Sequence, residues 1–167
     1  DNNKNPVVET YDVHTQNLTV GPRRSEYFCH LLHGGGGPGG GSGGRFVEFQ
    51  TNTSRIELYE LAAQQFPVFL DYLYSSQKDN AMSITTANVT ALYSLAKYFQ
   101  SPRLQHLAKK FWKVDIERSD TCEIYYEHAT LLQEVCILQA ATRSCKDNLL
   151  NITTSSRLLQ SAAYIQL

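Results

Sequence analysis

One segment, residues 55–75 (RIELYELAAQQFPVFLDYLYS), constrains the fold more than any other. Its first five residues alternate in polarity around Ile56 and Leu58, a two-residue period that is typical of a half-buried strand. Further along, apolar residues recur at the three- and four-residue spacing of one helix face; they are Phe66, Phe69, Leu70 and Leu73. The pattern therefore predicts a strand followed at once by a buried helix, with the rest of the chain packed around both.

Pro67 interrupts this predicted helix. A proline in a helix interior removes one backbone donor and clashes with the preceding turn, whereas a proline in the first turn does neither. We therefore expect a fresh helix to begin near Pro67, with residues 61–65 forming a separate turn.

Composition excludes several classes of protein. The 167 residues are 42% hydrophobic and 11% aromatic, which is enough to bury a core in one domain or one and a half. With 15 basic and 16 acidic residues the net charge is −1, which disfavours nonspecific binding to nucleic acid or to an anionic membrane. Apolar runs are far shorter than the roughly 20 residues that span a bilayer, and the polar N-terminus lacks a signal-peptide hydrophobic region. We expect a soluble protein of the cytoplasm or nucleus.

The cysteines and histidines do not cluster at metal-ligand spacing. The four cysteines, Cys29, Cys122, Cys136 and Cys145, include no CxxC pair and are expected to be reduced, structural thiols. His30 and His33 lie three apart on a predicted helix, but no third ligand lies near them in sequence. We therefore expect no metal site and no cofactor. Four glycosylation sequons, at Asn17, Asn52, Asn88 and Asn151, are treated as coincidental because no secretion signal is visible.

The first fifty residues contain two further strand candidates, residues 7–13 and 45–50, on either side of a predicted helix that starts at Pro22. The glycine-rich tract at residues 34–44 (GGGGPGGGSGG) is expected to be a flexible loop. It lacks the lysine and the following Ser or Thr of a phosphate-binding loop, so we assign it no phosphate.

Helical spacing dominates the chain after residue 82. Residues 82–84 are expected to be extended, with Thr86 as the N-cap of a helix that reaches Gln100, and Ser101 should cap the next helix with Pro102 at its first position. The inner face of this second helix is predicted to consist of Leu104, Leu107, Ala108, Phe111 and Trp112. A hairpin of residues 122–132 and 134–150 follows, with predicted facing stripes of Tyr125, Tyr126, Ala129 and Leu132 and of Val135, Leu138, Ala141 and Cys145. A third helix is expected to start at residue 155 or 156.

Three segments in order, residues 11–32, 54–76 and 88–112, resemble the BTB/POZ domain, a protein-interaction fold of many adaptor proteins. The residues that carry the resemblance are Val13-His14, Ser25 with Tyr27-Phe28, the LDYLY segment at residues 70–74, and Leu95, Ala96, Tyr98 and Leu104. The family's first strand is missing or begins only at Val7, and the glycine tract is an insertion. The hairpin is similar to the start of a BACK region, the helical extension that often follows such domains.

This resemblance implies an α+β fold that is mostly helical with a small sheet, followed by a helical hairpin. It implies a BTB/POZ-like domain at residues 1–116 and a partial BACK-like extension at residues 117–167. Its functional implication is a non-enzymatic adaptor that binds proteins, forms homodimers or hetero-associates, and commonly recruits a cullin scaffold in ubiquitin ligases.

The resemblance also indicates a partner-binding surface. The cullin-facing regions of the family correspond here to Asp71, Tyr72, Tyr74, Tyr125 and Tyr126, which are expected to lie close together. Tyrosine suits an interface because it buries much area with few rotatable bonds. The competing interpretation is that these tyrosines fill the core or the seam between the domain and the hairpin.

Two other functions compete with the adaptor. One is a tetramerising scaffold domain of the same superfamily. The other is an enzyme, whose candidate nucleophiles are Cys29 and Cys122 and whose candidate bases are His30, His33 and His128. Cys122 and His128 are six apart, on different faces of one predicted helix, and adjacent Cys29 and His30 also point apart, which disfavours catalysis.

Overall fold

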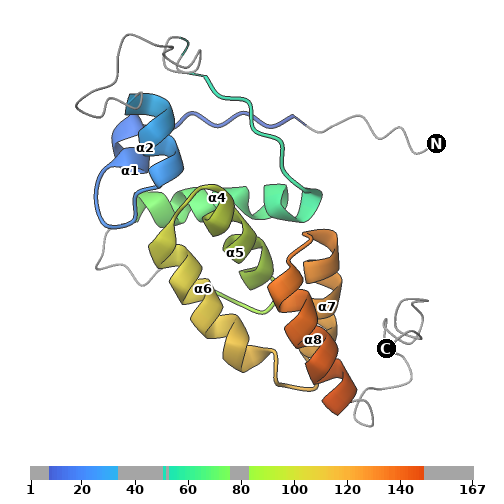
Figure 1. The fold of residues 1–167 in the computed structure, drawn as a ribbon. Helices are drawn as coiled ribbons and strands as arrows, with labels where there is room; N and C mark the ends of the chain where they lie inside the picture. The colour runs from blue at the N-terminus through green and yellow to red at the C-terminus, as the bar shows by residue number, and fades with distance from the viewer. Residues whose placement is uncertain (1–7, 34–50, 52, 76–82, 149–167) are drawn as a thin grey trace, which may run out of the picture.

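The computed structural model describes residues 8–33, 51, 53–75 and 83–148 (Figure 1). The described residues form seven helices and no strand: α1 (Thr15–Thr19), α2 (Glu26–His33), α4 (Glu60–Tyr74), α5 (Val89–Tyr98), α6 (Pro102–Asp115), α7 (Cys122–Leu131) and α8 (Val135–Asp147). None of these helices is long and apolar enough to cross a membrane. The mostly helical architecture is as predicted.

The small sheet is not found among the described residues. Residues 8–14 and 53–59 run as open stretches of chain, while the predicted strand at residues 45–50 lies outside the described part. The exposure of the side chains nevertheless alternates as predicted: Ile56 and Leu58 are half-buried, while Arg55, Glu57 and Tyr59 are exposed. A two-residue side-chain period predicts an extended backbone but not a neighbouring strand to bond with it. The predicted small sheet is therefore not confirmed.

Helix α4 runs without a break through Pro67, so the fresh helix start predicted there is wrong. Pro67 is exposed, whereas Phe69, Leu70 and Leu73 of the same helix are buried. Its missing N–H removes only the helix bond that would reach the carbonyl of Ala63. Packing of the apolar face holds the helix together across that gap.

The first core cluster lies around α2, α4 and α5. Its centre is Phe99, whose ring stacks on Phe28 and Phe69 with ring centroids 5.1 and 5.0 Å apart. Ser25 fixes the start of α2 beside this stack: its hydroxyl accepts the N–H of Phe28 at 3.2 Å and donates to the carbonyl of Phe99. The cap satisfies one of the free N–H groups at the start of α2.

Helix α5 lies between this cluster and a second one (Figure 1). Seven of its ten residues are buried, with Leu92 and Leu95 in the first cluster and Val89 and Tyr93 in the second. The second cluster joins α5 and α6 to the antiparallel hairpin of α7 and α8. Helix α5, rather than the predicted segment at residues 55–75, is therefore the element that links the two halves of the core.

The helices after residue 82 follow the predicted order, with four local differences. Ser101 lies at the N-cap of α6 as predicted, but its side chain makes no capping hydrogen bond. Helix α5 begins at Val89 rather than after Thr86, whose hydroxyl donates instead to Asp115 Oδ2 at 2.6 Å. Leu107, predicted to face inward, is 39% exposed. Val135 is likewise 61% exposed, and Ile137 is buried in the second cluster. The predicted helix start at residue 155 or 156 lies outside the described residues.

Candidate protein-interaction surface

The C-terminal end of α4 carries Asp71 and Tyr74, the accessible residues of the predicted partner surface on this helix. Together with His14, which the prediction did not include, they define what is here called the α4-end patch. All three are exposed, and Tyr74 is 40% exposed. The Tyr74 hydroxyl accepts the backbone N–H of His14, and the two rings meet edge-on at 6.2 Å. The patch thus presents a carboxylate beside an aromatic ring that a second segment of the chain holds in place.

Tyr72, the third predicted partner residue on α4, is 2% exposed and belongs to the first core cluster. The guanidinium of Arg23 lies 5.0 Å from the centre of its ring, within the range of a cation–π contact. Burial raises the pKa of the Tyr72 hydroxyl. Tyr72 therefore supports the patch from beneath and offers a partner almost no surface.

Tyr125 and Tyr126 differ although they are adjacent on α7. Tyr125 is 0% exposed, and its hydroxyl donates to Asp115 Oδ2 at 2.8 Å. Tyr126 is half-buried, and its side chain packs against the second cluster. For Tyr125, as for Tyr72, the competing interpretation of a tyrosine that fills the core fits the burial.

The five predicted residues do not form one surface. The Tyr74 end of α4 lies beside α1, whereas α7 lies toward the other end of α4 and packs chiefly against α8 and α5 (Figure 1). The expectation that these residues lie close together is therefore wrong. Only Asp71 and Tyr74 are both exposed and near each other.

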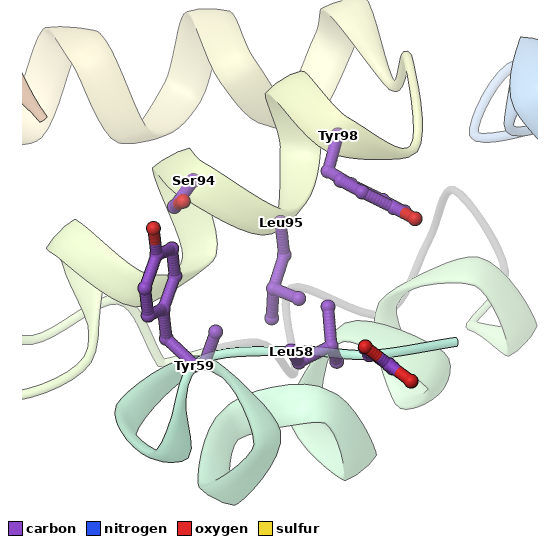
Figure 2. Close-up of a pocket in the computed structure, with 7 residues that line it drawn as sticks. Leu58, Tyr59, Ser94, Leu95 and Tyr98 are labelled. Atoms are coloured by element: carbon purple, nitrogen blue, oxygen red, sulfur yellow. The ribbon is translucent and has the colours of Figure 1, made fainter. Parts of the chain in front are cut away.

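A groove that the sequence did not indicate lies between the start of α4 and the outer face of α5. Its lining consists of Glu57, Leu58, Tyr59, Ala62, Ser94, Leu95 and Tyr98, and it encloses about 390 Å³. Tyr59 and Tyr98 lie at its two ends, with Leu58 and Leu95 between them (Figure 2). Both tyrosines are about half exposed, at 50% and 48%. A sequence feature that could have pointed to this groove is Tyr59, which the strand pattern already predicted to face outward.

Buried hydrogen bonds to Asp115, at the end of α6, fix the hairpin to the rest of the fold. Its carboxylate Oδ2 accepts the hydroxyls of Thr86 and Tyr125 at 2.6 and 2.8 Å. Its backbone carbonyl accepts the hydroxyl of Thr121, and Ser144 of α8 donates to the carbonyl of Ile116 at 2.6 Å. Segments from four parts of the sequence therefore meet at the end of α6, and the hairpin cannot swing freely there.

Burial disfavours a reactive thiolate at two of the cysteines, Cys29 and Cys145. Burial raises the pKa of Cys29, which disfavours the reactive thiolate. Cys122 and Cys145 are both 0% exposed, and burial together with the Cys122 thiol raises the pKa of Cys145. Within the described ranges, no three His, Cys, Asp or Glu side chains gather in an arrangement that could hold a metal ion.

Comparisons with known proteins relate this structure to a family. A search of curated proteins and a search of solved structures found no match. The family model of the BTB/POZ domain, in contrast, matches residues 22–116, more than half of the chain. The matched range contains α2, α4, α5 and α6 and stops before the α7–α8 hairpin. BTB/POZ domains are protein–protein interaction modules, generally not enzymes, and they mediate protein contacts and dimerisation. The chain belongs to the BTB/POZ domain family.

Proposed function

We propose that this chain is an adaptor that self-associates and recruits a cullin-type scaffold of a ubiquitin ligase. The observation that carries the proposal is the BTB/POZ match over residues 22–116, because the domain's general role is to bind proteins. Exposed tyrosines at the α4-end patch and the groove support it, since tyrosine is enriched at energetically important interface positions.

The scaffold contact in this proposal is the α4-end patch. Asp71 offers an exposed charge that can pair with a basic partner group, and Tyr74 offers an exposed ring whose position is fixed by His14. A preorganised ring loses little side-chain freedom on binding, which favours affinity. Tyr126 lies outside this contact because α7 lies away from the Tyr74 end of α4 (Figure 1).

We further propose that residues 117–167 are a partial BACK-like extension of a BTB/POZ-like domain at residues 1–116. Support comes from the antiparallel α7–α8 hairpin and from its rigid attachment at Asp115. The proposed site of action is the cytoplasm or nucleus, where reducing conditions would keep all four cysteines as the free thiols observed here. A fluorescent fusion protein would locate the chain in cells.

The test is a pull-down of a cullin N-terminal domain with the full 167-residue chain. Wild type should retain the cullin domain at micromolar concentration, and Asp71→Lys and Tyr74→Ala should each weaken retention about tenfold or more, as truncation of a main interface residue typically does. Leu131→Ala is the matched control, because Leu131 is an exposed apolar residue on α7, outside the patch. Circular dichroism would show that all three variants remain folded.

Two results would contradict the proposal. Absence of cullin binding by wild type would remove the scaffold role. Equal retention by wild type and both patch variants would keep a scaffold role but place its contact elsewhere on the chain.

A further inference from the structure

The groove between the start of α4 and the outer face of α5 is built by the core. Leu95, between its two ends, is 1% exposed, and half-buried Leu58 packs against the first core cluster. Ala62 also lines the groove and contributes only a methyl group, which leaves space beside the two leucines. The shape of the groove therefore comes from packing that stabilises the fold, and it is set before a ligand arrives.

Two tyrosine rings close the ends of the groove (Figure 2). Tyr98 is 48% exposed, and its ring lies against Phe99 and Tyr27, with ring centroids 4.9 and 5.6 Å away. Tyr59 is 50% exposed and lies at the N-cap position of α4. The neighbours of Tyr98 hold its ring in place, so the ring loses little freedom when a ligand packs on it.

The charges around the groove favour a cationic group. Glu57 is the charged residue among the described residues that line it, and its side chain is 85% exposed. Arg55 lies 3.8 Å from Glu57 and is itself 83% exposed, so water screens this pair and the carboxylate stays available. Lys97, which precedes Tyr98, donates instead to Glu134 at 2.8 Å, toward the α7–α8 hairpin. A basic group on a ligand is therefore favoured near Glu57, and an acidic group is disfavoured.

The lining suits a proline-rich peptide in the extended polyproline II conformation. Such peptides dock in grooves lined by aromatic side chains, and their preformed backbone costs little entropy to order. Their backbone carbonyls make no internal hydrogen bonds, so they can accept from the hydroxyls of Tyr59, Tyr98 and Ser94, which all line the groove. An amphipathic helix, in contrast, docks through apolar anchors spread over two turns. A groove of about 390 Å³ is near the lower end of the range for ligand sites, so it suits a shorter segment.

We propose that this groove binds a short proline-rich segment of a partner protein, with prolines on the rings of Tyr59 and Tyr98 and a basic side chain beside Glu57. The site differs from the scaffold contact proposed above, because the groove lies at the start of α4 and the α4-end patch at its C-terminal end. At 1.5 Å per residue, the helix of 15 residues places the two roughly 20 Å apart. One chain can therefore hold a proline-rich partner and a second protein at the same time.

Fluorescence anisotropy of labelled peptides, titrated with the full 167-residue chain, tests the site. The probe is the peptide RPPLPPLPR, which carries a basic residue at either end and so allows both orientations. Its controls are EPPLPPLPE, with the charges reversed, and RAALAALAR, without proline. Wild type should bind RPPLPPLPR about tenfold or more tightly than either control.

Two variants connect the binding to the groove. Tyr98→Ala should weaken binding of RPPLPPLPR about tenfold or more, as loss of a main interface side chain does. Glu57→Lys should prefer EPPLPPLPE to RPPLPPLPR, and it should keep the wild-type circular dichroism spectrum because the side chain is 85% exposed. Leu131→Ala, an exposed apolar residue on α7, is the control and should stay within about twofold of wild type.

Three results would overturn the proposal. If wild type leaves the anisotropy of RPPLPPLPR unchanged at millimolar concentration, the groove does not bind this class of peptide. Equal binding of RAALAALAR would show that the groove accepts any apolar segment. Wild-type affinity in Tyr98→Ala, together with an unchanged charge preference in Glu57→Lys, would place the peptide elsewhere on the chain. The cullin pull-down is independent of all three results, because it reports on the α4-end patch.

Discussion

Replacing Tyr125 with phenylalanine tests the claim that buried hydrogen bonds hold the hairpin in place. The substitution keeps the ring, which is fully buried, and removes only the hydroxyl that donates to Asp115 Oδ2 at 2.8 Å. A hydrogen bond to a charged group contributes about 1.5–3 kcal/mol to stability. Thr86 still donates to the same oxygen at 2.6 Å, and the Arg118 guanidinium lies 3.6 Å from Asp115 Oδ1, so the carboxylate keeps two partners and the lower part of that range applies. We expect a loss of about 2 kcal/mol.

The assay is reversible unfolding by urea and by heat. A loss of about 2 kcal/mol should lower the melting temperature by roughly 4–8 °C for a chain of this size. Tyr126→Phe is the matched control, because Tyr126 is the adjacent residue on α7 and is half-buried, whereas the hydrogen bond to Asp115 comes from Tyr125. It should change the free energy of unfolding by less than about 0.5 kcal/mol. Equal effects of the two substitutions would refute the role assigned to the Asp115 contact.

The same tyrosine gives a pH test with a defined sign. Burial, followed by the hydrogen bond to Asp115, raises the pKa of Tyr125 above its ordinary value. The resulting stability is complete below about pH 10, where an unfolded tyrosine is protonated, and is lost as the pH rises above it. The free energy of unfolding should fall there by up to about 1.4 kcal/mol per pH unit from this group. Tyr125→Phe should show a shallower fall, and an unchanged slope would contradict the assignment.

Three further predictions concern other parts of the chain. Pro67→Ala should stabilise the protein by roughly 1–2 kcal/mol in urea unfolding, because it restores a helix N–H at an exposed position; a destabilised variant would contradict the account of α4. A thiol reagent should label exposed Cys136 in the folded protein, but Cys122 and Cys145 only after unfolding, and mass spectrometry of the labelled peptides would show any other order. Shortening residues 34–44 to a few residues should change stability by less than about 1 kcal/mol, since loop-closure entropy varies only logarithmically with length; a larger fall in melting temperature would show that the tract is structural.

Helical order after residue 82 could be predicted because apolar spacing there is regular. The capping side chains could not, since Thr86 lies before the N-cap of α5 and the Ser101 side chain makes no capping hydrogen bond. Ser101 followed by Pro102 does mark the start of α6, and Leu104, Ala108 and Trp112 do form its buried face. The burial of a residue at the edge of such a face is harder to predict. Leu107, for example, is exposed although it directly precedes the buried Ala108. Periodicity places a side chain to within about a quarter turn, which separates core from surface only at the middle of the stripe.

The partner surface shows the same limit more sharply. Tyr125 and Tyr126 are both apolar enough to suit a core or an interface, and adjacent helix positions differ by about 100° in direction. Only the tertiary contact with Asp115, ten residues earlier, decides that Tyr125 is the buried one. The groove at Tyr59 and Tyr98 depends on two helices meeting, so no local pattern contains it.

The extended segment marks a different limit. Alternation at Ile56 and Leu58 correctly indicated which side chains turn toward the core, but pairing depends on a second strand that local sequence does not specify. Pro67 does not interrupt α4, because helix propensity is a weak guide when the rest of a helix face is buried.

The most direct test of the account is the molar mass of the chain, alone and with a cullin N-terminal domain, by gel filtration with light scattering. If the chain self-associates and binds the scaffold, its mass should rise from 18.8 kDa toward twice that value as its concentration increases, and it should elute together with the cullin domain. A mass of 18.8 kDa at every micromolar concentration, with the cullin domain eluting separately, would contradict the account.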